Sequence, residues 1–223
     1  MDLADEYPII PFFLIILNVL SAIPVILLII IANKSQIHGN CRFLVSAWAA
    51  GFLFLFACNI NVAHINLQLT DGYLTKSMFE PVERNISCQI IVALSFFCSV
   101  LEVAIAIERI VSSWIEPHIY HDRGFSLPKL LILMLIITLL SAFVGYFAHG
   151  MRYVKLGGVI LSAVDGSTIL INLYAVSFCR RQYEKLFGRA SLNARYQVRE
   201  AYEMAQAMKP VYVCSLLTVG KGL

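Results

Sequence analysis

The sequence predicts an all-α membrane protein, a bundle of transmembrane helices, and three observations support this prediction. The chain of 223 residues is 59% hydrophobic and only 14% charged, whereas an ordinary soluble domain is about one-quarter charged. Its apolar residues gather in five continuous segments, each long enough to cross a hydrocarbon core of about 30 Å, which takes roughly 20 helical residues. These segments lack the alternation of barrel strands, so helices are expected.

Each predicted span follows one apolar run. Asp, Glu, Lys and Arg are absent from the first, second and fourth runs, while the third carries only Glu102 and the fifth only Asp165. A sixth run would rise only about 15 Å as a helix, half of a crossing. We therefore expect one transmembrane domain over residues 1–223, cut off within its sixth span, with spans at 7–32, 43–69, 88–107, 130–148 and 156–178 and a partial span at 210–219.

The distribution of basic residues predicts the orientation of the chain, because cytoplasmic loops collect Lys and Arg. With the N-terminus outside, the inner segments hold Lys34, Arg42, Arg109, Arg123, Lys129, Arg180, Arg181, Lys185, Arg189, Arg195, Arg199 and Lys209. The outer segments then hold only Lys76, Arg84, Arg152 and Lys155. We expect an outside N-terminus, and we attribute the net charge of +3 to topology and membrane lipid rather than to nucleic acid.

Two shorter signals fit this orientation. Asn85-Ile86-Ser87 is an N-glycosylation acceptor triplet in the predicted outer loop between the second and third spans. On the inner side, the segment 192–208 is rich in good helix formers, so we expect a helical extension that leads into the sixth span. Arg199 and Glu203 are placed to pair within that helix at a spacing of four.

Ionisable residues inside a span are costly and usually face the interior of the bundle. Helical steps of three and four along the third span give a stripe of small and polar residues: Ser95, Ser99, Glu102, Ala106 and Arg109. The same steps along the fifth span give Gly158, Ser162, Asp165, Ile169 and Asn172. Each helix thus presents one polar seam with an acid at its centre.

Two interpretations of the seams remain open. They are packing faces whose acids are protonated or hydrogen-bonded, or they line a ligand or ion pathway that uses Glu102, Asp165, Ser99, Ser162 and Asn172. The remaining polar residues of the spans are expected to form hydrogen bonds between helices: Asn18, Asn59, Asn61 and His64. Asn172 has this alternative role as well.

Other chemistry has little support in the sequence. Cys41 and Cys179 lie at inner helix ends, where reversible palmitoylation is an option. His118 and His121, followed by Asp122, lie in a predicted inner loop without a third convincing metal ligand. Gly166-Ser167 lacks the surrounding pattern of a serine nucleophile. We expect no enzyme activity, no metal and no cofactor.

Two local strings on the predicted inner side resemble a known family. The string Ala106-Ile107-Glu108-Arg109-Ile110-Val111-Ser112-Ser113-Trp114 is similar to the Glu-Arg motif that closes the third helix of nematode serpentine chemoreceptors. The string Leu192-Asn193-Ala194-Arg195-Tyr196-Gln197-Val198-Arg199-Glu200 is similar to the Leu-x-x-Arg-Tyr-Gln-x-x-Glu signature before their sixth helix. The chain resembles class epsilon most, with classes alpha-beta and alpha close to it.

The resemblance implies a seven-helix G-protein-coupled receptor for sensory perception of a chemical stimulus, here truncated in its sixth helix. It would lie in the plasma membrane of sensory neurons, bind a small-molecule ligand from outside and activate a heterotrimeric G protein inside. Glu108 and Arg109 would form the coupling switch, and Arg195, Tyr196, Gln197 and Glu200 the inner-loop motif. The alternative is a small transporter or channel subunit in which Glu102 and Asp165 form an intramembrane ion path.

Overall fold

The computed structural model describes residues 9–34, 38–70, 82–114, 127–150 and 154–186, together with Arg195, Val198, Arg199, Tyr202, Glu203 and Gln206. Over the five ranges it is helical: α2 (Ile9–Lys34), α3 (Gly39–Thr70), α4 (Val82–Trp114), α6 (Leu127–Gly145), the π-helix η1 (Tyr146–Gly150) and α7 (Val154–Leu186). Five helices among the described residues are long and apolar enough to cross a membrane. The predicted all-α bundle of transmembrane helices is therefore confirmed.

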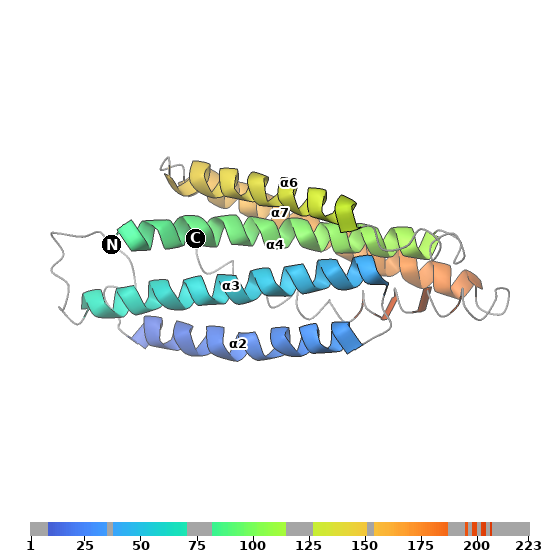
Figure 1. The fold of residues 1–223 in the computed structure, drawn as a ribbon, viewed down its shortest axis with the longest axis horizontal. Helices are drawn as coiled ribbons and strands as arrows, with labels where there is room; N and C mark the ends of the chain where they lie inside the picture. Colours follow the sequence, from blue (N-terminus) through green and yellow to red (C-terminus); the bar gives the residue numbers. More distant parts are fainter. Residues whose placement is uncertain are drawn as a thin grey trace.

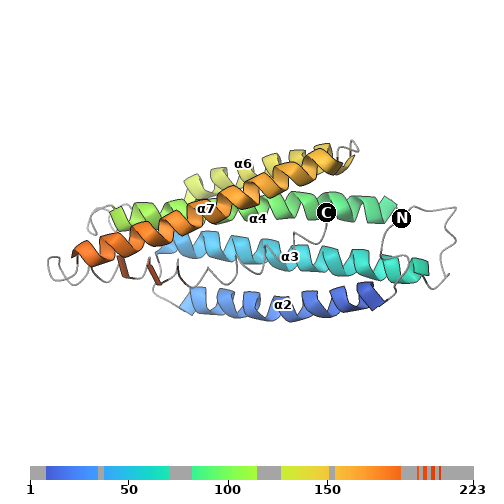
Figure 2. The same cartoon turned by 180° about the vertical axis from the view of Figure 1, so that it is seen from behind.

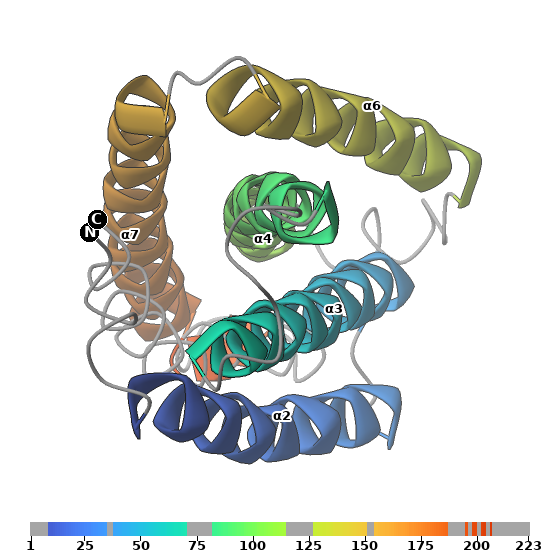
Figure 3. The same cartoon turned by 90° about the vertical axis from the view of Figure 1, so that its left-hand side faces the viewer.

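Consecutive helices run in opposite directions along the long axis of the bundle (Figure 1). Viewed from its end, the bundle has α4 in the middle, with α3, α6 and α7 around it and α2 on the far side of α3 (Figure 3). From behind, α7 runs obliquely across α4 (Figure 2). Among the residues of α4 with described side chains, only Asn85, Ile86, Ile107 and Trp114 are exposed. The helix that carries Glu102 is thus the central helix of the bundle.

The helices extend past the apolar runs that predicted them. The third run ends at Ile107, whereas α4 begins at Val82 and continues to Trp114. The fifth run ends at Phe178, whereas α7 continues to Leu186 through Arg180, which pairs with Glu184 at 2.9 Å. Hydrophobicity identifies only the part of a helix that lies in the hydrocarbon core of the membrane. The backbone hydrogen bonds of the helix can continue beyond that part into water. The partial span at 210–219 lies outside the described residues.

Large apolar side chains cover the outward surfaces of the outer helices. Phe13 of α2, Leu135 of α6 and Leu170 of α7 are 57%, 60% and 69% exposed. In a soluble protein such a surface would drive aggregation, but in a bilayer it faces acyl chains that are as apolar as the side chains themselves. These residues are the lipid-facing surface of the bundle.

The tightest packing is between α4 and its neighbours. Trp48 and Val45 of α3 and Leu101 of α4 are completely buried. Glycines allow close approach on two sides of α4. A Cβ on Gly51 of α3 would lie 3.0 Å from the Cys98 sulfur, and a Cβ on Gly145 of α6 would lie 2.7 Å from the backbone oxygen of Gln89. Small residues are what bring membrane helices into van der Waals contact.

Candidate functional site

The predicted polar stripe of the third span faces protein. Along α4, Ser99, Glu102 and Arg109 are 7%, 5% and 4% exposed, and Ala106 between the two charged residues is also buried. Glu102 and Arg109 are two helical turns apart on one face, about 10 Å along the axis. Each is the centre of a separate group of polar contacts with other helices.

The first group, which we call the acid cluster, consists of Trp48, Ser99, Glu102, Asp165 and Thr168. Trp48 Nε1 of α3 donates a hydrogen bond of 3.1 Å to Glu102 Oε1. Ser99 Oγ of α4 donates a hydrogen bond of 2.5 Å to Asp165 Oδ1 of α7. Thr168 Oγ1 of α7 lies 3.4 Å from the Ser99 carbonyl oxygen and also donates to Val164 of its own helix at 2.8 Å. The two polar seams therefore meet, and each acid accepts a hydrogen bond from a neighbouring helix.

Three helices position the acid cluster. Trp48 is completely buried between α3 and α4, and its ring centroid is 4.6 Å from that of Phe52 one turn further along α3. This packing fixes the indole so that its N–H meets the Glu102 carboxylate. On α7, Thr168 lies three residues after Asp165, so both side chains share the face that meets α4.

The two acids differ in access. Glu102 is almost completely enclosed, whereas Asp165 is half-buried. A carboxylate that keeps part of its surface open can accept a hydrogen bond or an ionic contact from a small cationic or hydrogen-bond-donating molecule. Asp165 is thus the more accessible acid of the cluster, and Glu102 is the more enclosed one.

The composition of the fifth-span seam differs from the prediction at three positions. Ser162 is exposed, and α7 as a whole runs obliquely to α4 (Figure 2). Asn172 is buried, but its amide donates to the Thr168 carbonyl within the same helix at 2.9 Å. Thr168, which the prediction omitted, is 2% exposed and makes the contact with α4.

Trp48 was also absent from the predicted site, although its place in an apolar span indicated a polar contact. A buried indole N–H usually finds a hydrogen-bond acceptor, and acceptors other than backbone carbonyls are few in an apolar bundle. A tryptophan near the start of the second predicted span therefore indicated a polar partner on another helix. The nearby acids Glu102 and Asp165 were the obvious candidates.

The second group, the arginine cluster, lies at the predicted inner end of α4 and consists of Cys41, Arg109, Ser112, Ser113 and Cys179. Arg109 Nη2 donates a hydrogen bond to Cys41 Sγ of α3. Cys179 Sγ of α7 donates to the Arg109 carbonyl oxygen and to Ser113 Oγ, both at 3.7 Å. Ser112 Oγ donates to the same carbonyl at 3.0 Å. Within the described part of the chain, Arg109 Nε has no hydrogen-bond partner.

Glu108 and Arg109 have different partners. Glu108 Oε1 lies 3.7 Å from His38 Nδ1, just before α3, and both side chains are 16% exposed. Successive helical residues point about 100° apart, so Arg109 enters the bundle while Glu108 stays at its edge. Cys41 and Cys179 are 2% and 0% exposed, so their burial disfavours the palmitoylation that their position suggested.

Among the other polar residues of the spans, one forms the predicted interhelical bond. Asn61 Nδ2 of α3 donates to Ser87 Oγ of α4 at 3.1 Å. The expectation is wrong for Asn18 and His64, whose bonds go to Leu14 and Gln68 of their own helices at 2.7 and 2.9 Å. The carbonyls and side chains four residues away in the same helix are close to a polar side chain, so a hydrogen bond to them needs little additional ordering of that side chain.

The glycosylation triplet lies in a helix rather than in a loop. Asn85 is exposed in the first turn of α4, and Ser87 is 8% exposed because it accepts the bond from Asn61. The prediction placed the start of the helix at the start of the apolar run, which is six residues too late.

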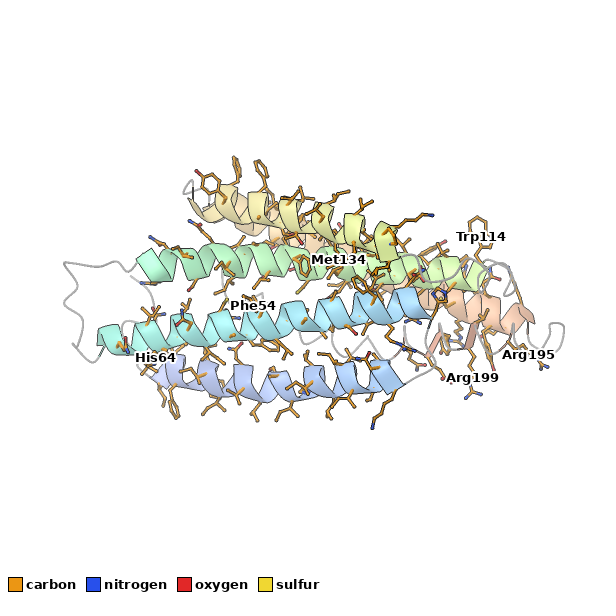
Figure 4. All side chains as sticks on the ribbon, in the orientation of Figure 1. Phe54, His64, Trp114, Met134, Arg195 and Arg199 are labelled. Carbon is orange, nitrogen blue, oxygen red and sulfur yellow. The ribbon has the colours of Figure 1, made fainter. Side chains whose placement is uncertain are left out.

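The inner-loop motif is described only in part. Arg195 and Arg199 lie beside the C-terminal end of α7 (Figure 4). Arg199 Nε and Glu203 Oε1 form the predicted ion pair at 2.6 Å. Tyr202 stacks on Tyr183 of α7 with ring centroids 6.5 Å apart, so this segment packs against the extension of α7. Tyr196, Gln197 and Glu200 lie outside the described residues.

The fold and its two buried polar clusters define a multi-pass helical membrane protein. Comparison with models of known protein families found no match, and neither did comparison with curated proteins.

Proposed function

We propose that this protein is a chemosensory receptor of the seven-helix, G-protein-coupled type, similar to nematode serpentine receptors of class epsilon. In this proposal the N-terminus is outside the plasma membrane of a sensory neuron, a small molecule binds from outside and a heterotrimeric G protein binds inside. The observation that supports it is the arrangement on α4, where the acid cluster and the arginine cluster share one face of a single central helix.

Signalling across a membrane needs two sites and an element that both sites affect. In our proposal the outer site contains Asp165, with Ser99 beside it, and the inner site contains Arg109 with Glu108. A ligand that takes the Asp165 carboxylate away from Ser99 changes a contact between α7 and α4. Because α4 is a continuous helix from Ser99 to Arg109, a shift or rotation there moves the inner site too.

The proposal is tested by measuring G-protein activation. Membranes of cells that express the full chain with a Gα subunit are assayed for GTPγS binding while a panel of volatile and soluble amines, alcohols and ketones is applied. We expect Asp165→Asn to weaken an active compound about tenfold or more, a loss of about 1.4 kcal/mol of binding free energy. Ser162→Ala, a change at an exposed position one turn away on α7, is the matched control and should leave potency unchanged.

The inner site has its own readout in the same assay. Arg109→Gln is expected to reduce maximal GTPγS binding while leaving the potency of the active compound within about threefold, under 1 kcal/mol. No stimulation by any compound in a protein that reaches the cell surface would contradict the proposal. So would ion flux through reconstituted vesicles that Glu102→Gln and Asp165→Asn both abolish, because that result identifies a transporter or channel.

The proposed orientation is tested separately. An epitope tag before Met1 should be labelled by antibody on intact cells, and a tag after Leu223 only after permeabilisation. Basic residues determine which loops stay in the cytoplasm, so labelling of the N-terminal tag only after permeabilisation would reverse the proposed direction of signalling.

A further inference from the structure

The last described residues of the chain pack against the C-terminal end of α7. Tyr202 stacks on Tyr183, with ring centroids 6.5 Å apart and ring planes 9° apart, and Val198 is 3% exposed. From Arg195 to Arg199 the chain runs back along α7 (Figure 4). This segment is therefore antiparallel to α7 where the two are in contact.

The contact sets a register for the residues that follow. The ion pair of the segment joins residues at the helical spacing of four, and two antiparallel helices rise by the same amount per residue. Tyr202 and Tyr183 are level with each other. Cys214 comes twelve residues after Tyr202, and Ile171 comes twelve residues before Tyr183. In this register, Cys214 is level with Ile171 in the C-terminal half of α7.

At that level α7 has a side that none of the described helices covers. Leu173, Ser177 and Arg180 follow one another on one face at steps of four and three, and all three are exposed, Leu173 by 51%. Within the described part of the chain, the Ser177 hydroxyl has no hydrogen-bond partner, whereas the exposed Ser167 donates to a carbonyl of its own helix at 2.7 Å. A hydroxyl without a partner is unfavourable among acyl chains, so this side of α7 suits contact with protein.

The exposed sides of α2 and α6 have a different composition. Their exposed residues include no serine and are mostly Leu, Ile, Val and Phe. Such large apolar side chains suit lipid, while small and polar residues are typical of contacts between membrane helices. On α7 the exposed residues include Ser162, Ser167 and Ser177. The exposed side of α7 therefore resembles a helix-packing surface more than the lipid-facing sides of α2 and α6 do.

We propose that the face of α7 formed by Leu173 and Ser177 is the docking surface for residues 207–216 of the same chain. These residues lie outside the described part, and they run along α7 as the antiparallel continuation of the segment that stacks at Tyr202. The chain is already against α7 at Tyr202, four residues before Gln206, the last described residue, so it needs no further connection to reach this face. A second copy of the chain would have to displace a segment that is covalently held beside it. The inference does not depend on the receptor proposal or on the orientation in the membrane.

The test is disulfide formation by the native Cys214 in the full chain. Leu173→Cys puts a thiol about 3 Å along the axis from the level of Cys214, and a disulfide needs Cα atoms closer than about 7 Å. Ser177→Cys on the same face is about 9 Å from that level and is the control for register. Leu135→Cys, on the lipid-facing surface of α6, is the control for random collision. Each variant is oxidised with copper phenanthroline in lipid nanodiscs, blocked with N-ethylmaleimide and digested for mass spectrometry.

We expect the link between Leu173→Cys and Cys214 to form within one chain and to exceed the links of both controls by about fivefold or more, because only this pair is within disulfide reach. Ile169→Cys lies one turn away on the same face and equally far from the level of Cys214, so it should behave in the same way. It decides the outcome if Leu173→Cys does not elute as a single peak in size-exclusion chromatography. A link found only in dimers would assign the face to a second copy, and a link no stronger than in the controls would leave it to lipid. Either result would overturn the proposal.

Discussion

We expect Trp48→Ala to destabilise the bundle by about 3 to 5 kcal/mol, the usual cost of removing a buried tryptophan side chain. Trp48 is completely buried, packs against Phe52 and is the interhelical donor to Glu102. Since lipid is as apolar as the core, membrane helices associate mainly through van der Waals packing and hydrogen bonds. The alanine variant loses both, and it leaves the Glu102 carboxylate without its interhelical hydrogen bond.

A thiol-reactive fluorescent dye measures this loss during heating in detergent, because unfolding exposes the buried Cys98 and Cys179. A loss of about 4 kcal/mol should lower the midpoint by roughly 10 °C in a protein of this size. Trp48→Phe keeps most of the ring and removes the N–H, so we expect a loss of only about 1 to 3 kcal/mol, the cost of an unsatisfied buried acceptor.

Glu102→Gln provides the matching half of a double-mutant cycle. Its effect should be smaller in the Trp48→Phe background than in the native protein, since the hydrogen bond between Trp48 and Glu102 is already absent there. Equal effects of Glu102→Gln in both backgrounds, or a native melting temperature for Trp48→Phe, would show that the hydrogen bond contributes no stability and that only the ring packing matters.

The sequence predicted five spans well because the hydrophobicity of a span is a local property. The bilayer requires each run to be apolar along its whole length, so the runs are visible without any knowledge of neighbouring helices. Helix ends were less visible: Val82 and Leu186 lie in polar sequence, where the continuation of a helix depends on its contacts with other helices.

The acid cluster could be predicted only in part, for a geometric reason. Helical periodicity places Ser99, Glu102 and Arg109 on one face of α4, and the structure confirms that this face is buried. Which residues meet that face depends on how neighbouring helices cross it. The oblique path of α7 brings Thr168 rather than Ser162 against α4, and no periodicity within α7 alone reveals its crossing angle.

The same geometry explains the different outcomes at Glu108 and Arg109. Glu108 and Arg109 are adjacent in the sequence motif, and adjacent residues of opposite charge suggest an ion pair. On a helix, however, adjacent residues diverge, so the acid meets His38 and the arginine meets Cys41. The contact with Cys41 joins residues 68 positions apart, so it follows from the packing of α3 against α4 and not from local sequence.

Gly145→Leu is expected to separate α6 from α4. A Cβ at Gly145 would lie 2.7 Å from the backbone oxygen of Gln89 and 2.8 Å from the Ala93 Cβ. Neither group is the flexible end of a side chain, so the helices themselves must move apart. Overpacking of this kind costs about 1 to 3 kcal/mol and occasionally more, and we expect leucine, with three further carbons to place, to reach the upper end of that range.

Gly166→Leu on α7 is the matched control, because a Cβ there would meet nothing within 4 Å. Leucine is also a better helix former than glycine by roughly 0.8 kcal/mol, so this variant should melt at or above the native temperature in the same dye assay. Gly145→Leu should instead melt well below it. Equal melting temperatures for the two variants would mean that α6 moves away from α4 at little cost, and that the packing of α4 against α3 and α7 is enough to keep the acid cluster and the arginine cluster assembled.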